Sequence, residues 1–124
     1  MKYLVLIYGA ESAWAAMSPQ EAQQVSGRFM SYSEDIRRSG HYLGGNALQP
    51  VSAATTVRVR EGKVSATDGP FAETKEQLGG YYLIEAKDLN EAIQVAARVP
   101  SAHFGSIEVR PIRDMGPPPA TATA

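Results

Sequence analysis

The order of apolar patterns along the chain limits its fold more than any other feature of the sequence. Patterns typical of β-strands lie at residues 3–8, 41–48, 55–60, 63–67, 79–86 and 107–112. Two segments with the apolar spacing of helices, residues 18–40 and 88–99, interrupt these strands. This order predicts the α+β class, and within it a ferredoxin-like antiparallel sheet with two helices on one face and an extra β-hairpin.

Capping residues mark the expected beginning of each helix. Ser18 stands three positions before Glu21, which is the spacing of a capping box. Asp88 and Glu91 repeat this spacing at the second helix, with Asp as the cap. Gly40 follows a pair of arginines and one serine, and it predicts the end of the first helix.

The extra hairpin is expected to turn at Glu61 and Gly62. A two-residue turn at this point places Val59 opposite Val64. Apolar residues then face one another across the two strands, which favours this register.

The first strand is apolar on both faces. Tyr3, Val5 and Ile7 would lie on one face, and Leu4, Leu6 and Tyr8 on the other. Two helices can cover only one of these faces, and monomers rarely expose an apolar patch of that size. We therefore expect a two-fold homodimer with its sheets face to face, the arrangement of a dimeric α+β barrel. The alternative is that the segments 9–17 and 49–54, both expected to be loops, cover the second face.

Size and composition indicate one small globular domain. The chain has 124 residues, of which 44% are hydrophobic and 20% charged. We expect a single α+β domain over residues 1–114. A disordered tail rich in proline, alanine and threonine is expected over residues 115–124.

Charge and cysteine content exclude several classes of function. The net charge of −1 offers no basic excess for binding nucleic acid. The chain has no cysteine, which rules out disulfides and thiolate catalysis. No ligand spacing indicates a metal, and no motif indicates a cofactor, so we expect neither. The apolar N-terminal run is too short for a signal peptide or a membrane span, so a cytoplasmic location without membrane contact is expected.

The polar segment 67–80 is the candidate functional site. It is longer than a simple turn requires, and it sets acids between glycines and a proline. Asp68 and Glu73 are the candidate catalytic residues, as proton-handling groups in acid/base chemistry. The candidate ligand-binding residues are Tyr8, Gly69, Pro70, Phe71, Lys75, Glu76 and Tyr81. We expect a polar small-molecule pocket near residues 68–81, between sheet and helices.

Simpler roles remain open for the same residues. Asp68 precedes Gly-Pro and is also typical of a turn-forming aspartate. The charged residues after it fit a solvated surface, and the tyrosines fit core positions. Trp14 could either fix its loop to the core or form the lid of a pocket.

The segment 67–84 reads TDGPFAETKEQLGGYYLI and closely resembles the signature of the DGPF subgroup of YCII-related proteins. The likeness covers residues 1–112, including the first strand and the segment 106–111. It implies a dimeric α+β barrel in a small bacterial protein. In the wider family some members carry a His–Asp pair in a pocket. The corresponding helix position here falls near Phe29, while Asp68 keeps its place in the motif.

The resemblance leaves two functions open. One is a small-molecule pocket with acid/base chemistry of the lyase or isomerase type. The other is a non-catalytic ligand-binding or accessory protein. Many relatives are encoded beside extracytoplasmic-function sigma factors, which implies a sigma factor as a partner.

Overall fold

The computed structural model describes residues 1–117, so residues 118–124 of the expected tail lie outside the described residues. In chain order the elements are β1 (Lys2–Gly9), α1 (Glu11–Ala15), α2 (Pro19–Arg38), β2 (Tyr42–Ala47), η1 (Val51–Ala53), β3 (Thr55–Arg60), β4 (Lys63–Asp68), β5 (Gln77–Glu85), α3 (Leu89–Ala97), η2 (Pro100–His103) and β6 (Ser106–Pro111). All of the predicted strands are present, with ends that differ by one or two residues.

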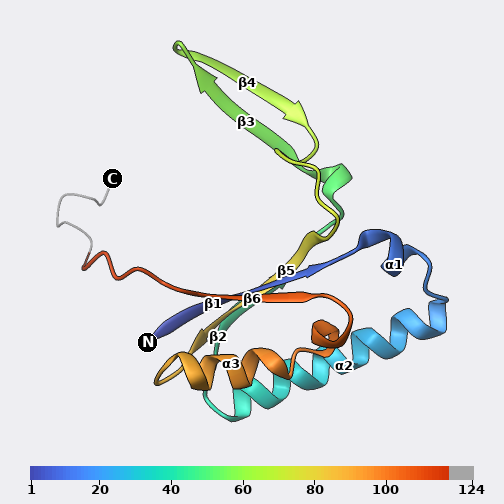
Figure 1. The fold of residues 1–124 in the computed structure, drawn as a ribbon, viewed down its shortest axis with the longest axis vertical. Helices are drawn as coiled ribbons and strands as arrows, with labels where there is room; N and C mark the ends of the chain where they lie inside the picture. The colour runs from blue at the N-terminus through green and yellow to red at the C-terminus, as the bar shows by residue number, and fades with distance from the viewer. Residues whose placement is uncertain (118–124) are drawn as a thin grey trace.

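The body of the molecule is a four-stranded antiparallel sheet in the order β2-β5-β1-β6. The long helices α2 and α3 lie along the same side of this sheet (Figure 1). This is the ferredoxin-like α+β arrangement that the sequence predicts. Tyr3, Val5 and Ile7 are buried under the helices, as the alternation along β1 requires.

Both predicted helix caps are confirmed. The Ser18 hydroxyl accepts a hydrogen bond from the Glu21 N–H at 3.1 Å, and Asp88 Oδ1 accepts one from the Glu91 N–H at 2.9 Å. Helix α2 ends at Arg38, and Gly40 follows with φ of 82°, a left-handed conformation that favours glycine.

The expectation of a loop over residues 9–17 was wrong for its central part. Residues 11–15 form the short helix α1. One turn of helix is too short to show an apolar stripe, so periodicity could not predict it. Tertiary packing stabilises this turn instead, because the Trp14 ring lies between those of Phe29 and Phe104, with centroids 6.4 and 6.0 Å away.

Strands β3 and β4 form a separate two-stranded sheet that projects from the body (Figure 1). Glu61 and Gly62 have φ of 52° and 76°, and Val59 pairs with Val64, so the predicted turn and register are confirmed. Of the twelve strand residues only Thr56 is even partly buried.

Candidate functional site

A cavity of about 1000 Å³ lies between α2 and the part of the sheet formed by β1, β2 and β5. Its deep residues, among them Ile7, Val25 and Tyr82, are buried, while Met30 and Leu48 at its rim are exposed. The lining is mainly apolar and aromatic. The cavity lies between sheet and helices as expected, but its walls differ from the polar pocket that the sequence suggested.

Glycines of β2 and β5 form part of the cavity wall. Gly45 and Gly80 line it, and both lie close to neighbouring protein atoms. A Cβ atom at Gly45 would lie 2.8 Å from Cδ1 of Tyr82, so the ring of Tyr82 rests against bare backbone. The Tyr82 ring also packs edge-on against Tyr32 and Tyr42, with centroids 5.4 and 6.2 Å away.

The α2 wall is a second stripe of that helix, beside the stripe that packs into the core. Phe29, Ser33 and Arg37 follow one another at intervals of four residues. The Ser33 hydroxyl lies 2.9 Å from the Phe29 carbonyl oxygen and 2.7 Å from the Tyr82 hydroxyl. This bond to Tyr82 ties the helix to the sheet within the cavity.

The rim beside β2 carries charge. The Arg37 guanidinium lies 4.4 Å from the centre of the Tyr42 ring, as in a cation–π contact. Arg37 also forms an exposed ion pair with Glu34, with 3.4 Å between Nη1 and Oε1. Salt screens such exposed pairs, so Arg37 remains able to meet an anionic group of a ligand.

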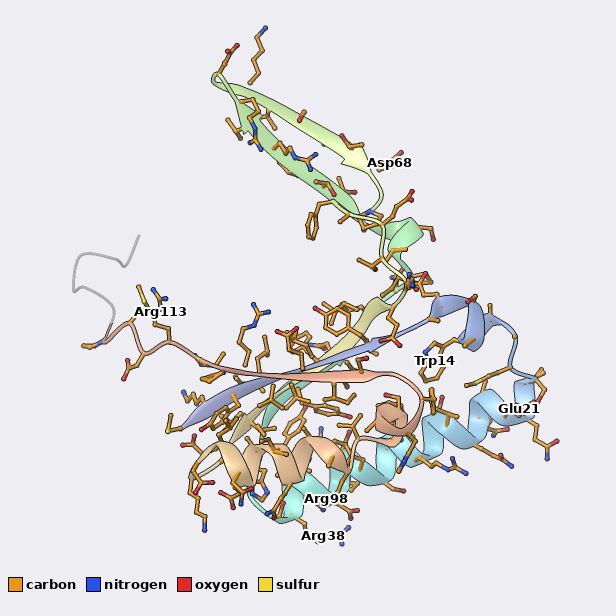
Figure 2. The ribbon with its side chains drawn as sticks, in the orientation of Figure 1. Trp14, Glu21, Arg38, Asp68, Arg98 and Arg113 are labelled. Carbon is orange, nitrogen blue, oxygen red and sulfur yellow. The ribbon has the colours of Figure 1, made fainter. Side chains whose placement is uncertain are left out.

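Helix α1 lies at another edge of the cavity, where Trp14 points toward α2 (Figure 2). Glu11 holds this helix in place. Its carboxylate accepts a hydrogen bond from the Val51 N–H at 3.0 Å, and its own N–H donates to Gln77 Oε1 at 2.9 Å. Of the two roles left open for Trp14, the contacts with Phe29 and Phe104 support the first, and its place in the lining is compatible with the second.

Two of the nine predicted site residues, Tyr8 and Tyr81, line the cavity. The other seven do not. Asp68 lies at the end of β4, out on the hairpin (Figure 2). The structure therefore does not bring Asp68 and Glu73 together with the two tyrosines, and the catalytic role of the two acids stays a prediction.

The Asp-Gly-Pro-Phe motif forms the base of the hairpin. The Gly69 N–H donates to the Ala54 carbonyl oxygen at 2.7 Å, and the Thr56 hydroxyl donates to the Gly69 carbonyl oxygen at 2.8 Å. Gly69 has φ of 99°, which only glycine adopts readily. Phe71 and Lys75 are exposed. Within residues 1–117 no group of three or more histidines, aspartates and glutamates is arranged to hold a metal ion.

Sequence reasoning missed most of the cavity walls. Phe29, Ser33 and Arg37 were not among the predicted site residues, although all three line the cavity. Their common feature is a four-residue spacing on the helix that precedes the glycine-rich strand β2. A helix stripe that combines an aromatic residue with polar ones, facing a strand with two adjacent glycines, is the signal that could have found the cavity.

Two groups with shifted pKa values lie outside the cavity. Burial raises the pKa of Tyr32, whose hydroxyl donates to the Val95 carbonyl oxygen at 2.8 Å. Hydrogen bonds from the Lys87 N–H and then from the His41 ring lower the pKa of Glu91. Neither group is a candidate for chemistry on a ligand bound in the cavity.

The fold and the cavity define a small ferredoxin-like α+β protein with an aromatic-lined pocket between helix α2 and its sheet. The family model of the YCII-related domain matches residues 1–116, and the chain belongs to this family. A relative from Rhizobium meliloti (strain 1021), called "Uncharacterized protein R00369", is 40% identical over 114 residues. This similarity covers 90% of the present chain and 92% of the relative. No helix within residues 1–117 has both the length and the apolar character to cross a membrane.

Proposed function

We propose that this protein binds a small, ring-containing molecule in the cavity between α2 and the sheet. The cavity itself is the observation that carries the proposal. Its volume of about 1000 Å³ is at the upper end of the range of known ligand sites, and its apolar walls with a few polar groups are typical of such sites.

The walls favour a flat ligand. Aromatic rings from three elements, those of Trp14, Phe29 and Tyr82, line the cavity and offer faces and edges for stacking. Arg37 at the rim would pair with an anionic substituent that stays near solvent. The inner part would take the apolar ring system.

The dye anilinonaphthalene sulfonate tests this proposal, because it combines aromatic rings with one anionic group. Trp14 is the only tryptophan in the sequence and lines the cavity, so quenching of its fluorescence by the bound dye reports on this site. We expect saturable quenching by the dye and an increase in dye emission.

Two phenylalanine substitutions on the exposed surface of α2 localise the binding. Ser26 lines the cavity and Gln23 does not. Ser26→Phe should weaken dye binding by at least about tenfold, and Gln23→Phe by less than about twofold. Equal affinity in both variants, or no quenching in the wild type, would contradict the proposal.

The proposal is limited to binding. Asp68 and Glu73 lie outside the cavity, so acid/base chemistry by these two residues draws no support from its geometry. Association with a sigma factor rests on the sequence resemblance alone and stays a prediction.

A second copy of the chain is the partner that we propose. Leu4, Leu6 and Leu83 lie on the sheet face opposite the helices, and each is only partly buried. Val57, Val59 and Val64 are likewise exposed, on one face of the hairpin. Two such surfaces on one chain support a two-fold dimer, which would cover both.

Sedimentation of a Leu6→Glu variant tests the dimer. A charge at the centre of the open sheet face should convert a dimer into a monomer, because a buried unpaired charge is costly. Leu89→Glu is the matched control, since Leu89 is half-exposed in the first turn of α3, where an acid is tolerated. A monomeric wild type, or a Leu6→Glu variant that remains a dimer, would refute this partner.

A further inference from the structure

Ser101 carries a buried hydroxyl group without a partner. Its side chain is 1% exposed, and it has the only buried side-chain polar atom in residues 1–117 that lacks a hydrogen bond. Buried hydroxyl groups are almost always paired in folded proteins, so this atom calls for an explanation.

Other buried or partly buried hydroxyl groups follow the usual rule. Tyr32 donates to the Val95 carbonyl oxygen at 2.8 Å, and Ser33 and Tyr82 share a bond of 2.7 Å. The chain therefore supplies partners for polar atoms within its packed core. Ser33 and Tyr82 also line the cavity but are hydrogen-bonded to each other, whereas Ser101 lines it and its hydroxyl has no protein partner.

The local fold holds Ser101 firmly at this position. It lies in η2, and its carbonyl oxygen accepts hydrogen bonds from the N–H groups of Phe104 and Gly105 at 3.2 and 2.8 Å. A Cβ atom at Gly105 would collide with the Tyr8 carbonyl oxygen, so the backbone just after η2 packs directly on the end of β1. A group that is held in place before binding loses little entropy when a ligand arrives.

The surroundings limit the kind of group that Ser101 can meet. The cavity residues Ile7 and Val25 are buried and apolar, and the charged residues of the lining all belong to other elements, namely α1 and α2. A charged ligand atom beside Ser101 would lose its water without gaining a counter-ion. A hydroxyl group can both donate and accept, so it suits a neutral oxygen.

We propose that the Ser101 hydroxyl is the inner polar contact of the cavity, and that its ligand is a ring compound carrying an uncharged hydroxyl or carbonyl oxygen. This inference rests on the proposed binding function and adds the chemical class of the ligand. The oxygen would form a hydrogen bond with Ser101 while the ring lies among the aromatic walls. Of two ligands with the same shape, the cavity would then bind the one with this oxygen more tightly.

Titration with p-cresol and p-xylene tests this selection, because the two compounds differ only by a hydroxyl in place of a methyl group. Affinities are measured by two-dimensional amide NMR on the wild type and on Ser101→Ala. We expect the wild type to bind p-cresol about tenfold more tightly than p-xylene, the size of one net hydrogen bond. In Ser101→Ala the p-cresol hydroxyl would be buried without a partner, so the preference for p-cresol should disappear or reverse in favour of p-xylene.

A stability measurement separates binding from folding. Because the hydroxyl has no protein partner, Ser101→Ala should unfold at the same temperature as the wild type or a higher one. Ser65→Ala on the hairpin is the matched control and should keep the full preference for p-cresol. If Ser101→Ala does not fold, nuclear Overhauser contacts between p-cresol and the Ser101 side chain of the wild type decide the question.

Three results would overturn the inference. Equal wild-type affinities for the two compounds would mean that Ser101 meets only water, while the cavity would remain a binding site. A preference for p-cresol that survives in Ser101→Ala would place the polar contact elsewhere. Failure of both compounds to bind the wild type would overturn this inference together with the proposed function, whereas dye binding that responds to Ser26→Phe would still support the cavity.

Discussion

Apolar side chains are buried in the four-stranded body but exposed in the β3–β4 hairpin. In the body, Tyr82 and Ile84 of β5 are 8% and 0% exposed beneath the helices. In the hairpin, Val59 and Val64 are 56% and 72% exposed, although they pair across the strands in the predicted register. Correct strand pairing thus does not by itself bury apolar side chains. A two-stranded hairpin gains stability only when something covers it.

The largest expected difference between the two regions is in the cost of truncating a side chain. Tyr82→Ala removes a nearly buried ring and should lower the free energy of unfolding by about 3–5 kcal/mol. In the dissociated monomer, Val59→Ala should change it by less than about 0.5 kcal/mol, because the hairpin then stands free. Urea denaturation at low protein concentration, where the proposed dimer dissociates, measures both values. A large cost for Val59→Ala in the monomer would break the comparison, because it would mean that the hairpin is covered within a single chain.

Adding a methyl group to β2 sharpens the comparison within the body. A Cβ atom at Gly45 meets the Tyr82 ring and the Tyr81 carbonyl oxygen at 2.8 and 2.9 Å. Gly45→Ala should therefore cost about 1–3 kcal/mol by overpacking. Gly44→Ala is the control, since a Cβ atom there meets nothing within 4 Å. Thermal unfolding that affects both variants equally would show that the close approach at Gly45 is unimportant.

Removing a single tyrosine hydroxyl group measures how much a buried hydrogen bond stabilises the body. Tyr32→Phe removes the donor to the Val95 carbonyl oxygen and should lower the free energy of unfolding by about 1–2 kcal/mol. Tyr81→Phe removes a bond of 2.9 Å from the Asn46 side chain at an exposed position and should cost less. Chemical denaturation that ranks the two variants in reverse order would contradict this reasoning.

Acid should weaken the start of α3 by a small amount. The pKa of Glu91 is lowered in the folded state, first by the Lys87 N–H at 2.6 Å and then by the His41 ring. A lowered folded pKa means that this contribution is complete above the unfolded value of about 4.3 and disappears as the pH falls through the folded value. Glu91→Gln should thus be less stable than the wild type at neutral pH, with a difference that closes below pH of about 4. Unfolding temperatures measured across this range would refute the idea if the difference stays constant.

The smallest effect is expected from the acids near the hairpin. The double variant Asp68→Asn with Glu73→Gln should change the affinity for anilinonaphthalene sulfonate by less than about twofold, because neither residue lines the cavity. Fluorescence titration measures this affinity. A loss of tenfold or more would mean that the hairpin reaches a binding site in the assembled protein, and the separation of the two regions would be wrong.

The sequence was sufficient for the fold because strand alternation, helix caps and the hairpin turn are local signals. Ser18, Asp88 and the pair Glu61-Gly62 act within a few residues of themselves, and each occupies its expected place. The cavity depends on distant contacts. Its walls come from segments that meet only after folding, such as Ser33 with Tyr82 at 2.7 Å.

The segment 67–80 shows why the candidate site was harder to predict. Its glycines and acids looked like a ligand loop, but Gly69 is required by the backbone conformation at the hairpin base. Gly80, by contrast, lines the cavity. Glycine therefore has two different roles in this segment, a backbone conformation at Gly69 and a place in the cavity wall at Gly80. These roles can be told apart only once the strand pairing is known.

The tight turn at Glu61 and Gly62 is a suitable place to attach a label to this protein. It lies at the far tip of the hairpin, distant from α2 and the four-stranded sheet (Figure 1). Exposed loop tips tolerate extra residues with little cost to the rest of a fold. A short peptide tag or a dye-labelled cysteine inserted there would report on the surroundings of the tip, while Trp14, some distance away, reports independently on the occupied or empty cavity.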